Sequence, residues 1–109
     1  MKRGDVWIVA GGADYAGKPR PVVIVQGEAF QLIDSVTICP LTTDATDLPL
    51  FRLAIEPSNT NGLRAPSRIM IDKVSTVPKS KLGDRIGQLS DTDLLRVNRA
   101  MLVFLGLAD

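Results

Sequence analysis

The stretch Arg20-Pro21-Val22-Val23-Ile24-Val25-Gln26 decides the fold, because it joins a charged residue and a proline to four consecutive apolar residues. An unbroken run of valine and isoleucine is typical of a strand that is buried on both faces of a sheet. Pro21 has no N–H group to donate, which suits the first position of a strand rather than its middle. The sequence therefore predicts a central strand with Arg20 at its rim, aimed by the rigid core behind it.

Further short strands are expected on either side, separated by turns rich in glycine and proline. Residues 50–56 alternate apolar and polar side chains, which predicts an antiparallel strand with one exposed face. Residues 66–75 are interpreted as one longer strand that carries Arg68 and Asp72 on a common surface. The other expected elements are strands over residues 4–10, 36–41 and 84–89, with short helical turns possible within 28–35 and 77–83.

The chain is expected to end in a helix over residues 91–105. Ser90 is a good N-cap, and Asp91 and Asp93 place negative charge in the first turn. The apolar surface of this helix is wide, so the helix can pack on the sheet with one side and on a second subunit with another. The sequence thus predicts a mainly β (α+β) domain spanning residues 1–109: a small bent antiparallel sheet or open barrel with a C-terminal helix.

Composition excludes several classes of protein. The chain has no histidine, which excludes a histidine general base and nearly every zinc site. Cys39 is its single cysteine, so no disulfide can form within the chain and a reducing cytoplasm is expected. No stretch approaches the ~20 apolar residues of a membrane-spanning helix. We therefore expect a cytoplasmic protein with no metal, no cofactor and no membrane partner.

Charge is close to balanced overall, with a formal net charge of +1, but it is unevenly distributed. Basic residues predominate over residues 60–85 and acidic residues over residues 27–59. The protein could present a basic face and an acidic face, or the fold could scatter ordinary solvated charges. The loop before Arg20 holds three glycines and can cover whatever Arg20 faces. Its one aromatic residue, Tyr15, either stacks on a ligand base or folds back onto the barrel.

Several segments, in order along the chain, resemble the MazF/PemK family of toxins. They are residues 1–7 (MKRGDVW), 17–25 (GKPRPVVIV), 36–43 (VTICPLTT), 71–77 (IDKVSTV) and 87–90 (GQLS), followed by the closing helix. The resemblance covers essentially the whole chain. It implies an SH3-like barrel of the CcdB/MazF type that forms a homodimer. It also implies a metal-independent endoribonuclease that cuts single-stranded RNA and is held silent by a cognate antitoxin.

The resemblance also implies roles for particular residues. The family's catalytic arginine and threonine fall on Arg20 and Thr42, and a carboxylate used by some members falls on Asp72. In the implied reaction the 2′-hydroxyl of the RNA attacks the adjacent phosphate, leaving a 2′,3′-cyclic phosphate and a 5′-hydroxyl. Arg20 would donate two hydrogen bonds to phosphoryl oxygens, and Asp72 is a candidate base. The residues expected to bind RNA around them are Lys18, Tyr15, Thr43 and Arg68.

Two departures from the family pattern concern the proton transfers and the RNA motif. The first loop is shorter than in many members and lacks their Glu or His. Met70 stands where members that use the carboxylate have an arginine, and Arg68 is the nearest replacement. Simpler readings also stand: Arg20 could be a structural charge at the rim, Thr42 a strand-end residue that bonds its own backbone, and Asp72 an ordinary solvated carboxylate.

Two other functions are possible on such a fold. A CcdB-like gyrase poison would place a Trp-Gly-Ile ending against gyrase, whereas this chain ends in Gly106-Leu107-Ala108-Asp109. A non-catalytic barrel, such as a decayed toxin, would bind nucleic acid or protein without cleaving RNA. Cleavage in EDTA that depends on Arg20 separates the ribonuclease from both alternatives.

Overall fold

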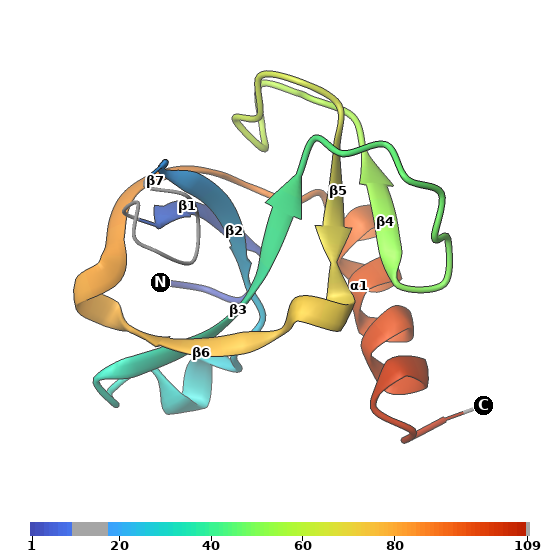
Figure 1. Cartoon of the computed structure of the whole chain (residues 1–109). Coiled ribbons are helices and arrows are strands. Elements are labelled where there is room, and N and C mark those ends of the chain that lie inside the picture. The colour runs from blue at the N-terminus through green and yellow to red at the C-terminus, as the bar shows by residue number, and fades with distance from the viewer. Residues whose placement is uncertain (10–17, 109) are drawn as a thin grey trace.

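The computed structural model describes residues 1–9 and 18–108. Its strands form one antiparallel sheet in the order β4-β5-β3-β2-β1-β7, and β6 pairs with the free edge of β3 (Figure 1). The elements are β1 (Asp5–Val9), β2 (Arg20–Ile24), β3 (Ser35–Thr42), β4 (Arg52–Ile55), β5 (Ser67–Met70), β6 (Ser75–Pro78), β7 (Leu82–Gln88) and α1 (Asp91–Phe104), with short 3-10 helices at Glu28–Phe30, Ile71–Lys73 and Lys79–Lys81.

The sheet divides into an open barrel and a smaller sheet that share β3. Strands β1, β2, β3, β6 and β7 curl round to form the barrel, whereas β3, β5 and β4 form a sheet backed by α1 (Figure 1). Among the described residues no ladder joins β6 to β7, so the barrel stays open. The expected architecture, a bent antiparallel sheet with a C-terminal helix, is confirmed.

β2 serves two separate hydrophobic cores. Val22 and Ile24 belong to the core that fills the barrel, and Val23 and Val25 belong to the core between the sheet and α1. All four side chains are buried. The predicted burial of this strand on both faces is confirmed, and it explains why an unbroken run of β-branched residues is found here.

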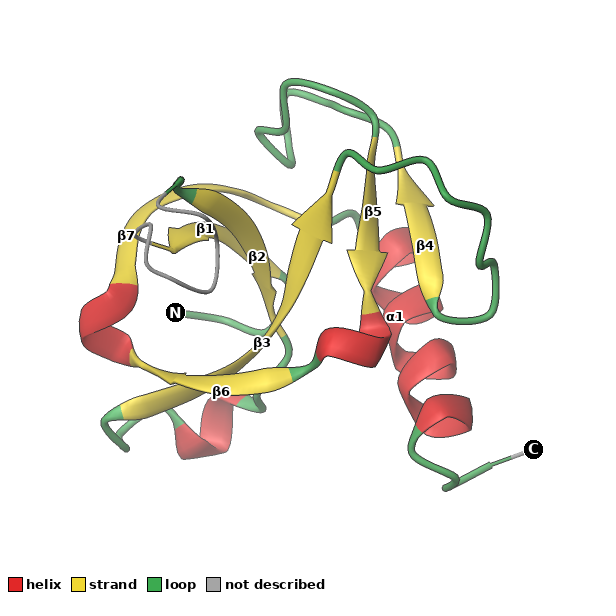
Figure 2. Cartoon of the chain, in the orientation of Figure 1, coloured by secondary structure: helices red, strands yellow, loops and turns green. Residues whose placement is uncertain are grey.

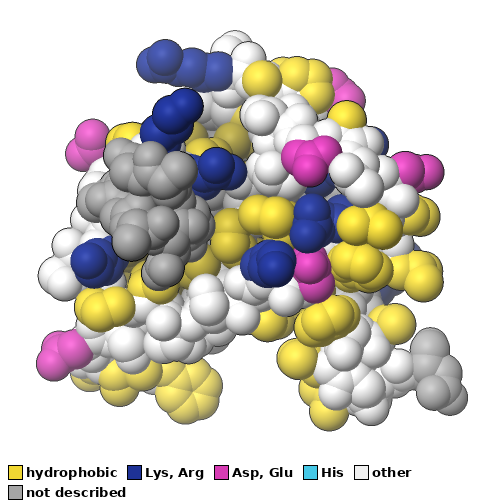
Figure 3. All heavy atoms as spheres, viewed as in Figure 1, with side chains coloured by type: hydrophobic (Ala, Val, Ile, Leu, Met, Phe, Trp, Pro, Cys, Tyr) yellow, Lys and Arg dark blue, Asp and Glu magenta, His cyan; other side chains and the backbone are white. Residues whose placement is uncertain are grey.

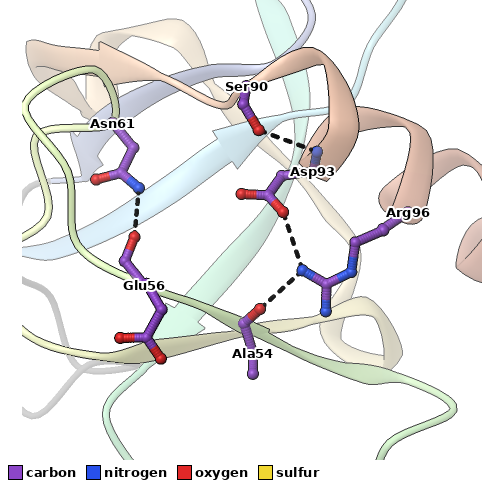
Figure 4. A network of polar contacts seen from close by, with 6 residues as sticks. All are labelled: Ala54, Glu56, Asn61, Ser90, Asp93 and Arg96. Atoms are coloured by element: carbon purple, nitrogen blue, oxygen red, sulfur yellow. Dashed lines mark hydrogen bonds and ion pairs between the residues drawn. The ribbon is translucent and has the colours of Figure 1, made fainter.

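The C-terminal helix begins and ends close to the predicted positions. The hydroxyl oxygen of Ser90 accepts a hydrogen bond from the backbone N–H of Asp93 at 3.1 Å, which confirms the N-cap. Arg96 then donates to the Asp93 carboxylate at 3.0 Å and to the carbonyl of Ala54 in β4 at 2.8 Å (Figure 4). The first turns of α1 are therefore tied to the outermost strand of the sheet. No helix within the described residues is long and apolar enough to cross a membrane.

The prediction of a single strand over residues 66–75 is wrong. The structure breaks it into β5 and β6, with a short 3-10 helix between them (Figure 2). Leu41 of β3 lies opposite Ile69, and Ile38 lies opposite Ser75, so β3 advances three residues while its partner advances six. The three extra residues form the 3-10 helix at the point where β3 passes from the smaller sheet to the barrel. The last strand also starts earlier than expected, at Leu82.

Candidate active site at the rim of the sheet

Three polar side chains lie abreast on neighbouring strands. Thr42 at the end of β3 is the register partner of Arg68 in β5. The β2–β3 register sets Val22 opposite Pro40, and carried on by two residues it sets Arg20 opposite Thr42. Directly opposite residues share one face of a sheet, and neighbouring strands are about 4.8 Å apart. Arg20, Thr42 and Arg68 therefore form a row roughly 10 Å long, with the threonine in the middle.

A hollow of about 300 Å³ opens at this rim. It contains four of the seven predicted site residues, from the segment before β2 and from the end of β3. Its lining consists of Lys18, Pro19, Arg20, Pro21, Leu41, Thr42, Thr43 and Ser67. Tyr15, a fifth predicted residue, lies outside the described residues. The hollow thus combines an ammonium, a guanidinium and three hydroxyl groups on a rigid edge, a combination that suits a phosphate.

Thr42 bonds to its local backbone and still keeps a donor. Its hydroxyl oxygen accepts a hydrogen bond from the backbone N–H of Asp44 at 3.1 Å. Asp44 in turn accepts from the N–H and the hydroxyl of Thr46, and the Thr46 hydroxyl is the main reason why the pKa of Asp44 is lowered. The simpler reading of Thr42 is therefore part of the structure. Because the contact uses Thr42 only as an acceptor, its O–H remains able to donate to a ligand.

Asp72 lies apart from this hollow, in the 3-10 helix that follows β5. Its two carboxylate oxygens accept from Nε and Nη2 of Arg52 at 2.9 and 3.0 Å, a bidentate pair. The side chains are only 15% and 20% exposed. Hydrogen bonding by Arg52 lowers the pKa of Asp72, and the same contact raises the pKa of Arg52. A carboxylate held in this way is a weak proton acceptor.

The arginine that faces Asp72 is thus Arg52 and not Arg68. The expectation that Arg68 replaces the family arginine missing at Met70 is therefore wrong. Arg52 lies opposite Met70 across the β4–β5 ladder, and the 3-10 helix turns Asp72 back toward β4. Sequence reasoning missed this partner because the two residues are 20 positions apart. The alternation over residues 50–56 did place Arg52 on the exposed face, but only the strand register shows which residue it meets.

Arg68 contacts the loop that follows β3. Its Nη1 lies 3.6 Å from the carboxylate of Asp47, whose side chain is 84% exposed. An acidic residue of the 27–59 segment therefore meets a basic residue of the 60–85 segment here, and Figure 3 shows acidic and basic side chains side by side near the middle of this view. The exposure of Asp47 makes this contact easy to displace.

Cys39 is excluded as a nucleophile. The side chain is completely buried in the core beneath α1. Burial raises the pKa of its thiol to about 12, so the reactive thiolate is scarce at neutral pH. The chemistry available at the rim therefore comes from cationic and hydroxyl groups.

The comparisons with known proteins identify the family and agree with this fold. A family model described as PemK-like, MazF-like toxin of type II toxin-antitoxin systems matches residues 2–105. The chain therefore belongs to this toxin family, and the resemblance found in the sequence is confirmed. Among individual relatives, it is 52% identical over 108 residues to a probable endoribonuclease MazF of Mycolicibacterium smegmatis, and the match covers 99% of each chain.

Solved structures show the same fold. An endoribonuclease in complex with its cognate antitoxin, from a mycobacterial species, superposes with a TM-score of 0.83 and 26% identity. The match covers all of this chain and 98% of the other. The Mycobacterium tuberculosis toxin MazF-mt6 superposes with a TM-score of 0.78 at 28% identity, covering 94% of this chain and 99% of that one.

Proposed function

We propose that this toxin is a metal-independent endoribonuclease that cleaves single-stranded RNA in the cytoplasm and is silenced by a cognate antitoxin. The observation that carries the proposal is the hollow in which Lys18, Arg20 and Thr42 meet on one rigid rim. The 52% identity to a probable endoribonuclease MazF supports the same assignment. The absence of histidine from the chain means that the reaction must proceed without the most common acid–base group of ribonucleases.

The proposed reaction uses the RNA's own nucleophile. The 2′-oxygen bonds to the adjacent phosphorus, and the bond from phosphorus to the 5′-oxygen of the next nucleotide breaks. The products are a 2′,3′-cyclic phosphate and a 5′-hydroxyl. Negative charge grows on the phosphoryl oxygens in the transition state, and the fork of Arg20 can donate two hydrogen bonds to them. Lys18 adds a second positive charge, and the Thr42 hydroxyl donates to the phosphate and orients it.

Asp72 is not favoured as the base in this reaction. It does not line the hollow, and its carboxylate is already bonded by Arg52. Among the described residues the hollow has no carboxylate in its lining. We therefore assign both proton transfers to water, which reaches the open rim, and assign Asp72 the task of holding β4 against the 3-10 helix. The catalytic role implied for Asp72 by the family pattern stays a prediction.

The decisive experiment is cleavage of a long single-stranded RNA by the purified protein in EDTA. We expect discrete cuts with 2′,3′-cyclic phosphate ends, and a loss of roughly 10²–10³-fold in kcat for Arg20→Ala, as for other preorganised donors to a developing oxyanion. Lys81→Ala is the control, because Lys81 is exposed in the 3-10 helix before β7 and does not line the rim hollow. Its cleavage rate should equal that of the wild type.

Failure of this experiment has a clear meaning. If the folded protein cuts no RNA that contains every short motif, or if Arg20→Ala cuts as fast as the control, the ribonuclease proposal is wrong. Binding of RNA without cleavage would then support the non-catalytic barrel, the alternative that the open basic rim still allows.

We further propose that the toxin forms a homodimer through α1. At the C-terminal end of the helix and its C-cap, four consecutive large apolar side chains are each 44% exposed or more: Leu102, Val103, Phe104 and Leu105. Next to them a groove of about 350 Å³ runs between α1 and the start of β4. Such a surface is typical of a subunit interface. Sedimentation of the wild type should give a dimer, and Val103→Glu should shift it to the monomer.

A further inference from the structure

A second hollow adjoins the rim site at the edge of the sheet. It has a volume of about 360 Å³, and Pro21, Thr43 and Ser67 line both hollows. The walls of the second hollow are largely apolar and come from Ile8 in β1 and Ile86 in β7. Its size lies within the roughly 300–1,000 Å³ of small-molecule sites. A ligand that crosses the sheet edge at Thr43 can therefore occupy both hollows at once.

The outer wall of this hollow is a turn that the structure holds firmly in place. The buried side chain of Asn61 donates to the carbonyl of Glu56 at 2.8 Å (Figure 4) and accepts from the N–H groups of Ser58 and Leu63 at 3.0 Å each. The turn also rests directly on β7. The next residue, Gly62, has a φ of +72°, and a Cβ atom there would lie 2.1 Å from the carbonyl oxygen of Ile86. The hollow is thus preformed rather than opened by its ligand.

We propose that this second hollow binds one nucleobase of the RNA, while a neighbouring phosphate lies against Arg20 and Thr42. The inference rests on the proposed function and deepens it, because it assigns the position at which the toxin reads a base. Three properties identify the occupant: continuity with the phosphate site, apolar walls that suit the face of a flat ring, and polar groups at the edge. Single-stranded RNA is recognised in this way, with splayed bases stacked and bonded along their edges.

The polar groups at the edge suggest how the base is selected. The Ser67 hydroxyl donates to the carbonyl of Ala65 at 2.9 Å, so toward a ligand its oxygen is an acceptor. Arg64 is exposed where the chain passes the hollow, and its guanidinium supplies donors. A base that presents an N–H group toward Ser67 and an acceptor toward Arg64 satisfies both.

The test measures binding, so that it does not depend on cleavage. The probe is a 2′-O-methyl heptanucleotide, which lacks the attacking hydroxyl, with the sequence of the mapped cut or, where the wild type cuts nothing, heptauridine. In companion probes each nucleotide in turn is made abasic, and affinity is measured by fluorescence anisotropy. We expect one abasic position to weaken binding by the wild type about tenfold or more, the typical effect of losing one stacked base.

Ala65 lines the second hollow, so the variant Ala65→Trp fills it, and Ala65→Ser is the size control at the same position. We expect Ala65→Trp to bind the intact probe about tenfold more weakly than the wild type does, which matches the loss caused by removing the critical base. For this variant, the abasic probe should bind no more weakly than the intact probe. The proposal is overturned if every abasic probe binds the wild type within about threefold of the intact one, or if Ala65→Trp binds RNA as tightly as Ala65→Ser. If Ala65→Trp does not fold, the wild-type abasic scan decides alone. A lack of cleavage in EDTA refutes the proposed function without altering either result.

Discussion

Two arginines on one face of the same sheet have opposite surroundings. Arg52 in β4 uses Nε and Nη2 in a bidentate pair with Asp72, and its side chain is only 15% exposed. Arg20 in β2 lies at an open hollow beside Lys18, and among residues 1–9 and 18–108 it takes part in no ion pair. The first guanidinium has its charge neutralised by a carboxylate of the fold, whereas the second keeps its charge and its paired donors for a ligand.

The difference separates a charge that holds the fold together from a charge that acts on a substrate. A paired, half-buried arginine is destabilising to remove because its carboxylate is left without a partner. An arginine on a rigid rim costs the fold little when it is removed, but it can lower a transition-state barrier because its donors are already aimed. The following changes test this division, starting with the largest expected effect.

Arg20→Lys should reduce cleavage by roughly 100-fold, at the low end of the effect of removing one preorganised donor. The positive charge stays, but the planar fork that donates two parallel hydrogen bonds is lost. The free energy of unfolding should stay within about 0.5 kcal/mol of the wild type. The matched change Arg52→Lys should leave kcat/KM within about threefold. Comparable losses of activity in both variants would contradict the division.

Arg52→Ala should lower the free energy of unfolding by about 2 kcal/mol, because the half-buried Asp72 carboxylate loses two charge-assisted hydrogen bonds. Urea unfolding followed by circular dichroism measures this change, and the exposed Lys81→Ala again serves as the control, with an expected change of less than about 0.5 kcal/mol. At temperatures well below unfolding the variant should cleave RNA nearly as fast as the wild type. A stable Arg52→Ala protein that has lost its activity would instead place Arg52 and Asp72 in the catalytic machinery.

The same pair should make stability depend on pH. Hydrogen bonding by Arg52 lowers the pKa of Asp72 in the folded state below its unfolded value of about 3.9. The contribution is therefore fully present above that unfolded value and is lost as the pH falls through the folded value. Between pH 6 and pH 3 the free energy of unfolding should fall more steeply for the wild type than for Asp72→Asn. Parallel curves would show that Asp72 is not held by its partner in solution.

The sequence predicted those features that depend on local chemistry. The burial of β2 could be predicted because four apolar residues follow a proline, and the start of α1 because Ser90 caps it. Arg20 and Thr42 were identified from the family pattern, and their common hollow follows from the register of two adjacent strands. These features need information from only one or two neighbouring segments.

The features that could not be predicted depend on contacts between distant segments. Nothing in Ile71-Asp72-Lys73-Val74, which holds neither glycine nor proline, marks the 3-10 helix that ends β5. Because the sequence does not reveal this break, it also does not reveal that Asp72 meets Arg52. The second hollow could not be predicted for a similar reason, because it depends on the close approach of Gly62 to Ile86, two residues that lie in different segments of the chain.

The smallest expected effect tests an intermediate case, Arg68. Its contact with Asp47 is 3.6 Å long and the carboxylate is highly exposed, so a phosphate can displace it at little cost. Asp47→Asn should therefore raise the affinity for the 2′-O-methyl probe by about twofold, while stability changes by less than about 0.5 kcal/mol. The gain should shrink in high salt and vanish when Arg68 is also replaced by alanine. A gain that persists without Arg68 would show that Asp47 repels the RNA directly, and Arg68 would then belong with Arg52 among the charges that serve the fold.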